Sequence, residues 1–414
     1  MSTGLADNIR KYRRTAGLSQ EGLAESAGLS LSTVRKVEQG GDVRVETLHA
    51  LARALRVSTS ALFATEAPRS VVGPQDDVNR QHLVELRRAL MPPIGLAAPL
   101  GADPVEPGGL DATRRKVRDA RALYDQDRYS SVAKLLPPLL RGSEAAVNVL
   151  DGEEQQHAVV ARCQVLLMTG QFLTQVRQYD MAYYALAEAT RLARENGQTL
   201  TAATGVVGMC WLLLRQDRFD ECEQLAAQTA AEIEPRLSSA SATHLAVWGE
   251  LWLRVAASSV RNNRPDVATE ARRMAATAAS AMGREDMGFP DHWGGFGPAT
   301  VEMKAIEDLS LTGDARGVLR RADEGPVGAR GLRNLGGVTS NNWNRHRLDV
   351  AKAHVASGEH QDAMGELMQI KQRAEGWITH QPMARYVMGD ILKTRKRTLT
   401  EEMRSMAAHL GVAG

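Results

Sequence analysis

Cysteine is scarce in this chain of 414 residues, which has only Cys163, Cys210 and Cys222. Three cysteines are too few for the disulfide framework of a small secreted domain, and an odd number cannot all be paired with one another. No stretch approaches the ~20 consecutive apolar residues of a membrane span, and the first residues lack the apolar core of a signal peptide. We therefore expect a cytoplasmic protein with reduced thiols and no membrane partner.

Motifs that carry enzyme chemistry are also missing. The sequence has no His-Glu-x-x-His pair, no Gly-x-Ser-x-Gly elbow, no phosphate-binding loop of the Walker type and no Cys-x-x-Cys pair. We therefore expect no catalytic residues, no metal, no cofactor and no enzymatic activity. The formal net charge of +2 does not by itself indicate a nucleic-acid partner, so any DNA-binding charge has to be local.

What the chain does have is helical periodicity, from one end to the other. In residues 1–66 five short helical patterns are separated by tight connections at glycines, among them Gly28 and Gly40-Gly41. Ser19 and Ser30 stand where they can cap the second and third of these helices. Beyond Leu110 no convincing strand pattern occurs, so the fold class is predicted to be all-α.

The second and third helices match a helix-turn-helix unit, because only Gly28-Leu29-Ser30 separates them. Their apolar stripes can pack together, with Leu23 and Ala24 against Val34 and Val37. This packing leaves short hydroxyls and long cations of the third helix pointing outward: Ser32, Thr33, Arg35 and Lys36. Hydroxyls suit base edges and cations suit phosphates, but an ordinary solvated helix face is the alternative interpretation.

Residues 13–24, 30–40 and 47–55 resemble, at the right separations, the Cro and lambda-repressor class of bacterial helix-turn-helix regulators, the XRE type. The resemblance implies an N-terminal five-helix domain that binds a double-stranded DNA operator. It implies a structural bridge between Arg13 and Glu38, and phosphate contacts from Gln20 and Arg35. It also implies that DNA is read from the start of the third helix, by Ser30, Leu31, Ser32, Thr33 and Lys36. Leu31 stands where a polar residue is frequent, so it either contacts a thymine methyl group or packs beneath the helix.

Residues 67–110 are rich in proline and glycine and are predicted to be a linker with one helix, Asp76–Leu90. The predicted domains are therefore 1–66 for DNA binding, 67–110 for the linker and 111–414 for a helical repeat domain.

Helical hairpins recur in residues 111–414, and their second helices follow similar polar turns. The turns are Asp127-Arg128, Arg177-Gln178, Asp217-Arg218, Asn263-Arg264, Gly313-Asp314 and Gly358-Glu359. The uneven intervals resemble degenerate tetratricopeptide-like (TPR-like) repeats, and an irregular helical bundle is the alternative. Residues 343–363 and 295–298 resemble parts of bacterial regulators that join a Cro-type domain to such repeats. That resemblance implies a signal-sensing surface for a peptide or small-molecule effector.

The candidate ligand-binding residues are Asn341, Asn342, Asn344 and Arg345, which lie beside Trp343. Asparagine amides both donate and accept hydrogen bonds, so they can hold a peptide backbone. Helix capping by an asparagine after Gly336-Gly337 is the alternative. Trp293 lies in an aromatic and glycine-rich segment that forms either the lip of a pocket or a packed loop between repeats.

Local charge in the N-terminal domain is small, with nine basic and seven acidic residues in positions 1–66. One such domain binds DNA weakly on electrostatics alone, so two copies and a homodimer are expected. We predict a bacterial transcription regulator whose repeat domain dimerises and senses a signal. The alternative is a protein-interaction scaffold, in which the repeats bind a protein partner and the DNA-binding domain only localises it.

Overall fold

The structure is a computed structural model, and it describes residues 3–15, 18–41, 43, 45–55, 57, 59–62, 83–93, 109–286, 294–325, 327–328, 337–394 and 400–412. The chain divides into two compact units, Met1–Gly73 and Pro74–Gly414. Over the described ranges the regular structure is helical, and the extended pairing consists of a single bridge between Asp286 and Phe296. The all-α prediction is confirmed. No helix in these ranges is both long and apolar enough to span a membrane.

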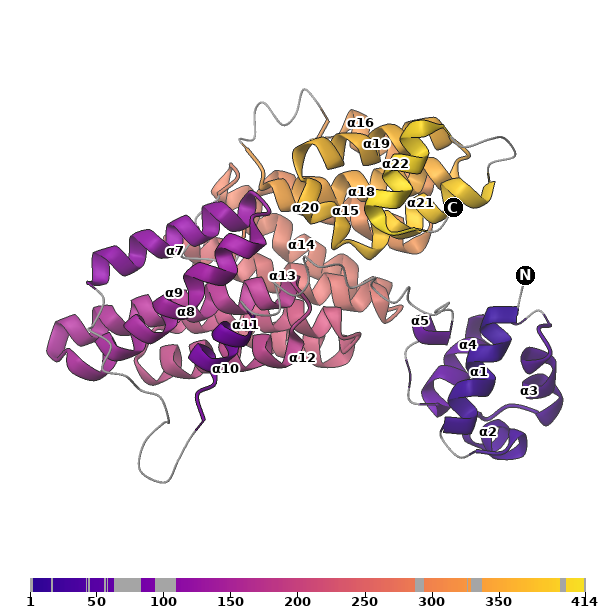
Figure 1. Ribbon diagram of the computed structural model, residues 1–414, viewed down its shortest axis with the longest axis horizontal. Coiled ribbons are helices and arrows are strands. Elements are labelled where there is room, and N and C mark those ends of the chain that lie inside the picture. The colour runs from indigo at the N-terminus through magenta and orange to yellow at the C-terminus, as the bar shows by residue number, and fades with distance from the viewer. Residues whose placement is uncertain are drawn as a thin grey trace. The chain divides into compact units, whose positions relative to one another are not determined.

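In the described part of the N-terminal unit, five short helices surround one apolar core (Figure 1). Leu23, Val34 and Leu51 are fully or almost fully buried at its centre. Because their aliphatic side chains leave water together, helices too short to be stable alone are held in one fold. The helices are α1 (Thr3–Thr15), α2 (Gln20–Ala27), α3 (Leu31–Glu38), α4 (Val45–Ala54) and α5 (Thr59–Leu62).

The connection between α2 and α3 is fixed by local chemistry. Ser19 caps α2 by accepting a hydrogen bond from the Gly22 amide, and Ser30 caps α3 by accepting one from the Thr33 amide. Gly28 ends α2 with φ of 64°, a left-handed conformation that a side chain would disfavour. The turn therefore sets the angle at which α3 leaves α2.

The helix predicted for the linker differs from expectation in its packing. Residues 83–90 are helical, whereas positions 76–82 lie outside the described residues. Leu86, Ala89 and Leu90 are buried in the main core of the C-terminal unit. An apolar stripe of this kind gains more by joining that core than by remaining in a solvated connection. This helix is thus part of the second unit.

The C-terminal unit is a series of antiparallel helices (Figure 1). The first ten are α7 (Leu110–Asp125), α8 (Tyr129–Val149), α9 (Gly152–Gln175), α10 (Tyr179–Glu195), α11 (Thr199–Arg215), α12 (Phe219–Glu232), α13 (Ala242–Arg261), α14 (Pro265–Met282), α15 (Pro298–Thr312) and α16 (Ala315–Glu324). They are followed by α18 (Ser340–Ala356), α19 (His360–Arg373), α20 (Glu375–Thr379), α21 (Pro382–Thr394) and α22 (Glu401–Leu410).

Helices of this unit pack in a regular order. From α7 to α16 each helix contacts the next one along the chain, so consecutive helices form hairpins. The first helices of the hairpins (α7, α9, α11, α13, α15 and α18) also contact one another in that order. These six helices, which we call the inner row, bring residues far apart in sequence onto one continuous surface.

One turn recurs between the helices. The second residue after the helix end has φ between 55° and 63° at Asp127, Arg177, Asp217 and Asn263, and glycine takes its place at other turns, such as Gly197 with φ of 68°. The second helices begin immediately beyond these turns, at Tyr129, Tyr179, Phe219 and Pro265, as the turn pattern predicts. The shared turn explains why the hairpins resemble one another although their lengths differ.

Candidate functional site

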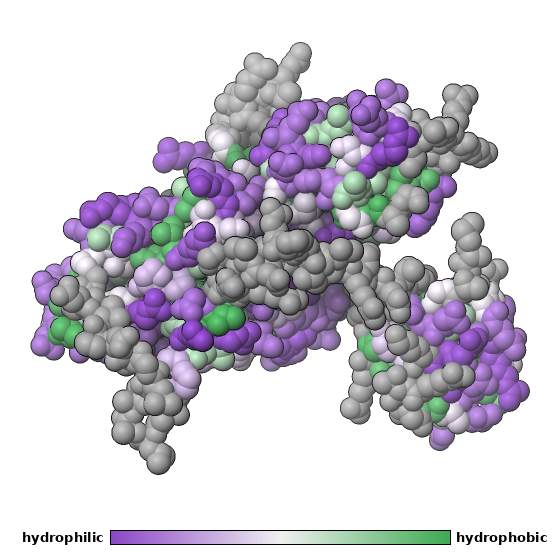
Figure 2. Space-filling view, in the orientation of Figure 1, coloured by the Kyte–Doolittle hydropathy of each residue, from purple (hydrophilic) through white to green (hydrophobic). Residues whose placement is uncertain are grey.

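The outward face of α3 carries most of the side chains predicted to contact DNA. Ser32, Arg35 and Lys36 are exposed, while Leu31 and Thr33 are half-buried. On the opposite side, Val34 and Val37 are buried against α2. The helix therefore presents hydroxyls and cations to solvent. Figure 2 shows a hydrophilic surface on the side of the N-terminal unit where Figure 1 places α3.

The hydroxyls at the start of α3 form one cluster. Ser30 Oγ lies 2.8 Å from Ser32 Oγ and 2.7 Å from Thr33 Oγ1. Arg35 makes a long ion pair of 3.5 Å with Glu21, and both side chains are more than half exposed. An exposed pair of this length contributes little stability, so the guanidinium can exchange its partner for a phosphate.

Beneath this face, Arg13, Gln20 and Glu38 form a largely buried polar network. Arg13 Nε donates to Glu38 Oε1 at 2.6 Å and Arg13 Nη2 donates to Oε2 at 3.0 Å. Gln20 Nε2 donates to the same Oε2 at 2.7 Å. The side chain of Glu38 is only 3% exposed, so these donors replace the water that its carboxylate has lost.

The pKa values of the network reflect this pairing. Burial alone would raise the pKa of Glu38, but hydrogen bonds from Arg13 and Gln20, together with the charges of Arg13 and Arg10, hold it below its ordinary value. The pKa of Arg13 is raised, first by its hydrogen bond to Glu38. Both groups are therefore charged at neutral pH, and the end of α3 is fixed to α1 and α2.

Two comparisons concern this region. A family model described as helix-turn-helix matches residues 9–62, which run from α1 to the end of α5. The control protein C.SmaI of Serratia marcescens is 39% identical over 70 residues, which are 17% of this chain and 83% of that protein. The chain belongs to the helix-turn-helix family. The helix-turn-helix domain is therefore the N-terminal unit, and α3 is the second of the two helices that the α2–α3 turn joins.

Two further contacts of the helix-turn-helix domain were missed by sequence reasoning. Arg10 Nη2 donates to the backbone carbonyl of Glu38 at 2.5 Å, and Asn8 Nδ2 donates to the carbonyl of Leu62 at 3.1 Å. Arg10 lies one turn before Arg13 on α1, and this spacing was the available signal. Together these contacts fasten α1 to the C-terminal ends of α3 and α5.

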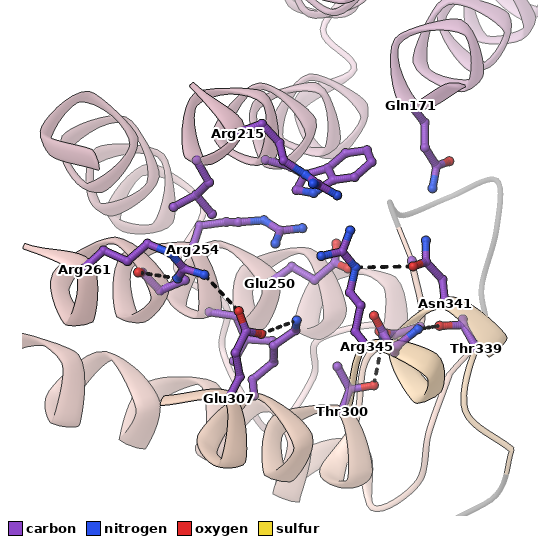
Figure 3. Close-up of a pocket in the computed structure, with 18 of the residues that line it drawn as sticks. Gln171, Arg215, Glu250, Arg254, Arg261, Thr300, Glu307, Thr339, Asn341 and Arg345 are labelled. Carbon is purple, nitrogen blue, oxygen red and sulfur yellow. Dashed lines mark hydrogen bonds and ion pairs between the residues drawn. The ribbon is translucent and has the colours of Figure 1, made fainter. Parts of the chain in front are cut away.

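In the C-terminal unit of this helix-turn-helix protein, the inner row encloses a cavity of about 210 Å³ (Figure 3). Three of the five predicted ligand residues, Asn341, Asn342 and Arg345, line it from α18. Asn344 faces a separate narrow cleft beside Tyr124 and is only 2% exposed. Trp293, the fifth, lies outside the described residues. The cavity thus brings together three of the predicted residues, and Asn344 faces the separate cleft, which Asn341 also lines.

The alternative role of these asparagines as helix caps is wrong. Thr339 caps α18, because its Oγ1 accepts a hydrogen bond from the Asn342 amide at 3.2 Å. Asn341 Oδ1 instead accepts from Arg345 Nε at 3.3 Å and from Trp377 Nε1 at 3.0 Å. The carboxamide of Asn341 therefore orients Arg345 at the edge of the cavity.

Most of the cavity wall comes from residues that the sequence did not single out. Gln171 on α9 and Glu250 on α13 are buried polar residues of the wall, and Trp211 on α11 supplies an aromatic one. Lys304 and Arg261 both bind Glu307, at 2.7 and 3.0 Å. Burial alone would raise the pKa of Glu307, but these two cations lower it well below its ordinary value. The wall is therefore polar and strongly charged.

Proposed function

We propose that the protein is a DNA-binding transcriptional regulator, in which α3 reads an operator in the major groove. The observation that carries the proposal is the outward face of α3, with Ser32, Arg35 and Lys36 exposed above the buried Arg13–Glu38 pair. Membership of the helix-turn-helix family supports it, as does similarity to a protein named a control protein. The proposal includes no enzymatic step and places the protein with the chromosome in the cytoplasm.

We propose individual contacts for this face, in line with the family resemblance. Ser32, Thr33 and Lys36 read base edges, with Leu31 against a thymine methyl group, whereas Arg35 binds a phosphate. Glu38 engages one of the two N–H groups of the Gln20 carboxamide, so that carboxamide can still donate a hydrogen bond to a phosphate. Ser30 keeps its capping role and adds its hydroxyl to the same cluster.

We further propose that the C-terminal unit is a TPR-like array that dimerises the protein and senses a peptide or small-molecule effector. The recurring left-handed turn and the inner row support the array, and the cavity lined by the inner row supports the sensor. An effector that prefers one curvature of the array would change the spacing of two DNA-binding domains and hence the operator affinity.

The test is a set of binding isotherms of the full chain with genomic DNA fragments over a salt series. Replacing Arg35 and Lys36 together by alanine should abolish sequence-specific binding and leave the helical content unchanged. Arg273→Ala is the matched control, because Arg273 is an exposed arginine on α14 paired with Glu270. Specific binding retained by the double variant would overturn the assignment of α3. Tight copurification with a stoichiometric protein partner, without any preferred DNA site, would favour the scaffold.

A further inference from the structure

Positive charge exceeds negative charge in the cavity of the C-terminal unit. Among the residues that the structure describes, two carboxylates, Glu250 and Glu307, belong to its wall. Six cationic side chains line the same space, from five helices of the inner row: Arg121, Arg215, Arg254, Arg261, Lys304 and Arg345. Because like charges in a confined space repel strongly at low dielectric, this excess has to be compensated.

Three of the six cations have carboxylate partners within the protein. Arg121 Nε donates to Asp125 at 2.8 Å, while Lys304 and Arg261 share Glu307. These pairs account for the carboxylate of Glu307, so Glu250 is the remaining acid of the wall. The carboxylates of Asp125 and Glu307 therefore compensate two of these three positive charges.

The other three, Arg215, Arg254 and Arg345, form no ion pair with any carboxylate that the structure describes. Nε of Arg254 and Nη2 of Arg345 are buried and have no hydrogen-bond partner within the same described ranges. Arg215 lies over the ring of Trp211, with 5.5 Å from its Cζ to the ring centroid. Even if Glu250 is counted against these three guanidiniums, two of them stay uncompensated among the described residues, in addition to the one positive charge left where Lys304 and Arg261 share Glu307.

These guanidiniums converge, although they come from α11, α13 and α18. Figure 3 shows the side chains of Arg215, Arg254 and Arg345 reaching toward the same space. Burial lowers the pKa of Arg215 to about 9, and the neighbouring charge of Arg345 adds to this shift. Because a guanidinium keeps its proton at neutral pH, the empty cavity holds these charges at a cost in free energy.

We propose that this cavity binds the phosphate group of a small phosphorylated molecule. A phosphate group has oxygens that point in several directions, so it can accept hydrogen bonds from guanidinium groups on three different helices. A phosphate monoester carries about two negative charges at neutral pH, enough to compensate two of the three guanidiniums of Arg215, Arg254 and Arg345. Trp211, Leu214 and Leu253 form an apolar part of the wall for the organic group. A volume of about 210 Å³ favours a compact ligand over a long peptide.

This inference deepens the sensor function proposed above and rests on it only for the effect on DNA. Phosphate binding would neutralise Arg215 and Arg345 together, so it would pull α11 and α18 toward one another. Helices of the inner row contact one another in order, and a shift between two of them changes the curvature of the array. The bound phosphate is therefore the proposed effector signal.

The binding test uses the full chain and three probes: inorganic phosphate, glycerol 3-phosphate and, at equal ionic strength, chloride. Calorimetric titration and thermal unfolding should show binding and stabilisation by the two phosphates but not by chloride. Tighter binding of glycerol 3-phosphate would identify an organic phosphate as the ligand, and tighter binding of inorganic phosphate would identify the free ion. Chloride stabilising as well as phosphate would overturn the proposal.

Variants separate a ligand site from a structural cluster. Arg345→Met and Arg215→Met should each weaken phosphate binding at least tenfold, while the melting temperature without phosphate stays equal or rises, because a buried repulsion is removed. Arg273→Met, at an exposed arginine of α14, is the matched control and should leave phosphate binding unchanged. A lower melting temperature of the cavity variants combined with unchanged phosphate binding would overturn the proposal.

Measuring operator affinity with and without the phosphate probe distinguishes failure of the phosphate site from failure of the proposed regulator function. If the inference is right, the operator affinity of the wild-type protein changes in the presence of the tighter-binding phosphate probe, and that of Arg345→Met does not. Loss of all DNA binding with intact phosphate binding would refute the regulator alone. Intact operator binding without any phosphate binding would refute this inference alone.

Discussion

Both units of the protein contain buried arginines, but these arginines differ in whether a carboxylate of the chain pairs with them. In the helix-turn-helix domain the buried guanidinium of Arg13 has a carboxylate partner in Glu38, and the exposed one of Arg35 faces solvent. In the C-terminal cavity Arg345 is oriented by Asn341 yet has no carboxylate partner that the structure describes. The buried charge paired within the chain stabilises the fold, whereas the one without a carboxylate partner is the basis of the proposed phosphate site.

Breaking the internal pair should have the largest effect on stability. Glu38→Ala leaves the guanidinium of Arg13 without its partner, and we expect a loss of about 3 kcal/mol of folding free energy in the helix-turn-helix domain. Hydrogen exchange followed by mass spectrometry would show faster exchange in α1 to α4. Glu25→Ala, at an exposed position on α2, is the control. Unchanged protection in Glu38→Ala would show that the network does not hold the domain.

A buried acid of the C-terminal unit offers the opposite case to Glu38. Burial raises the pKa of Asp349 to about 7, and the charge of Glu307 adds to the rise. The folded state therefore holds a proton that the unfolded state releases near pH 4, so stability should fall as the pH rises from about 4 to about 7 and stay level above.

Asp349→Asn should remove this pH dependence and raise stability above pH 7 by an amount on the order of 2 kcal/mol. Thermal unfolding at pH 5 and pH 8 would measure the difference. Asp266→Asn, at an exposed position of α14, should retain the slope of the wild type. An unchanged slope in Asp349→Asn would show that another group titrates in this interval.

The turns allow a smaller test. Gly197 has φ of 68°, so Gly197→Ala should destabilise the C-terminal unit by about 1 kcal/mol. Gly365 lies inside α19 with open space around it, and Gly365→Ala should stabilise by about 0.5 kcal/mol because alanine favours helix. Urea unfolding would measure both. Equal effects of the two changes would contradict a left-handed requirement at the turn.

The exposed pair on the DNA-binding face should matter least for folding. Glu21→Gln removes the partner of Arg35, and we expect a change below about 0.5 kcal/mol in stability. Because the change also removes a negative charge next to the proposed phosphate contact, DNA binding should strengthen severalfold at low salt. Titration with an operator fragment would show it. A large loss of stability would mean that Glu21 has a structural role.

Sequence reasoning worked where the structure is set by neighbours in the chain. The α2–α3 turn is determined by the caps Ser19 and Ser30 and by the left-handed Gly28. The positions of the two helices could therefore be predicted from the sequence alone. The hairpin turns at Asp127 and Asn263 were recognisable for the same reason. Such features depend on capping and on φ, which are local properties.

The cavity could only be predicted in part. The asparagine cluster near Arg345 was visible because its members are adjacent, although the turn that caps α18 uses Thr339. Arg215 and Arg254 carried no signal, because their convergence depends on the packing of α11, α13 and α18. The burial of the helix at 83–90 was missed because its amphipathic pattern does not say which surface it covers.

The side-chain oxygen of Asn341, Oδ1, links the cavity wall to the core of the last helices. It accepts one hydrogen bond from Arg345 in the cavity wall and another from Trp377, a side chain in the core formed by the last helices. If a ligand in the cavity turned the guanidinium of Arg345 away from Asn341, the indole of Trp377 would be the remaining one of these two donors to Asn341 Oδ1. The emission of this tryptophan would then report on cavity occupancy from the far end of the chain.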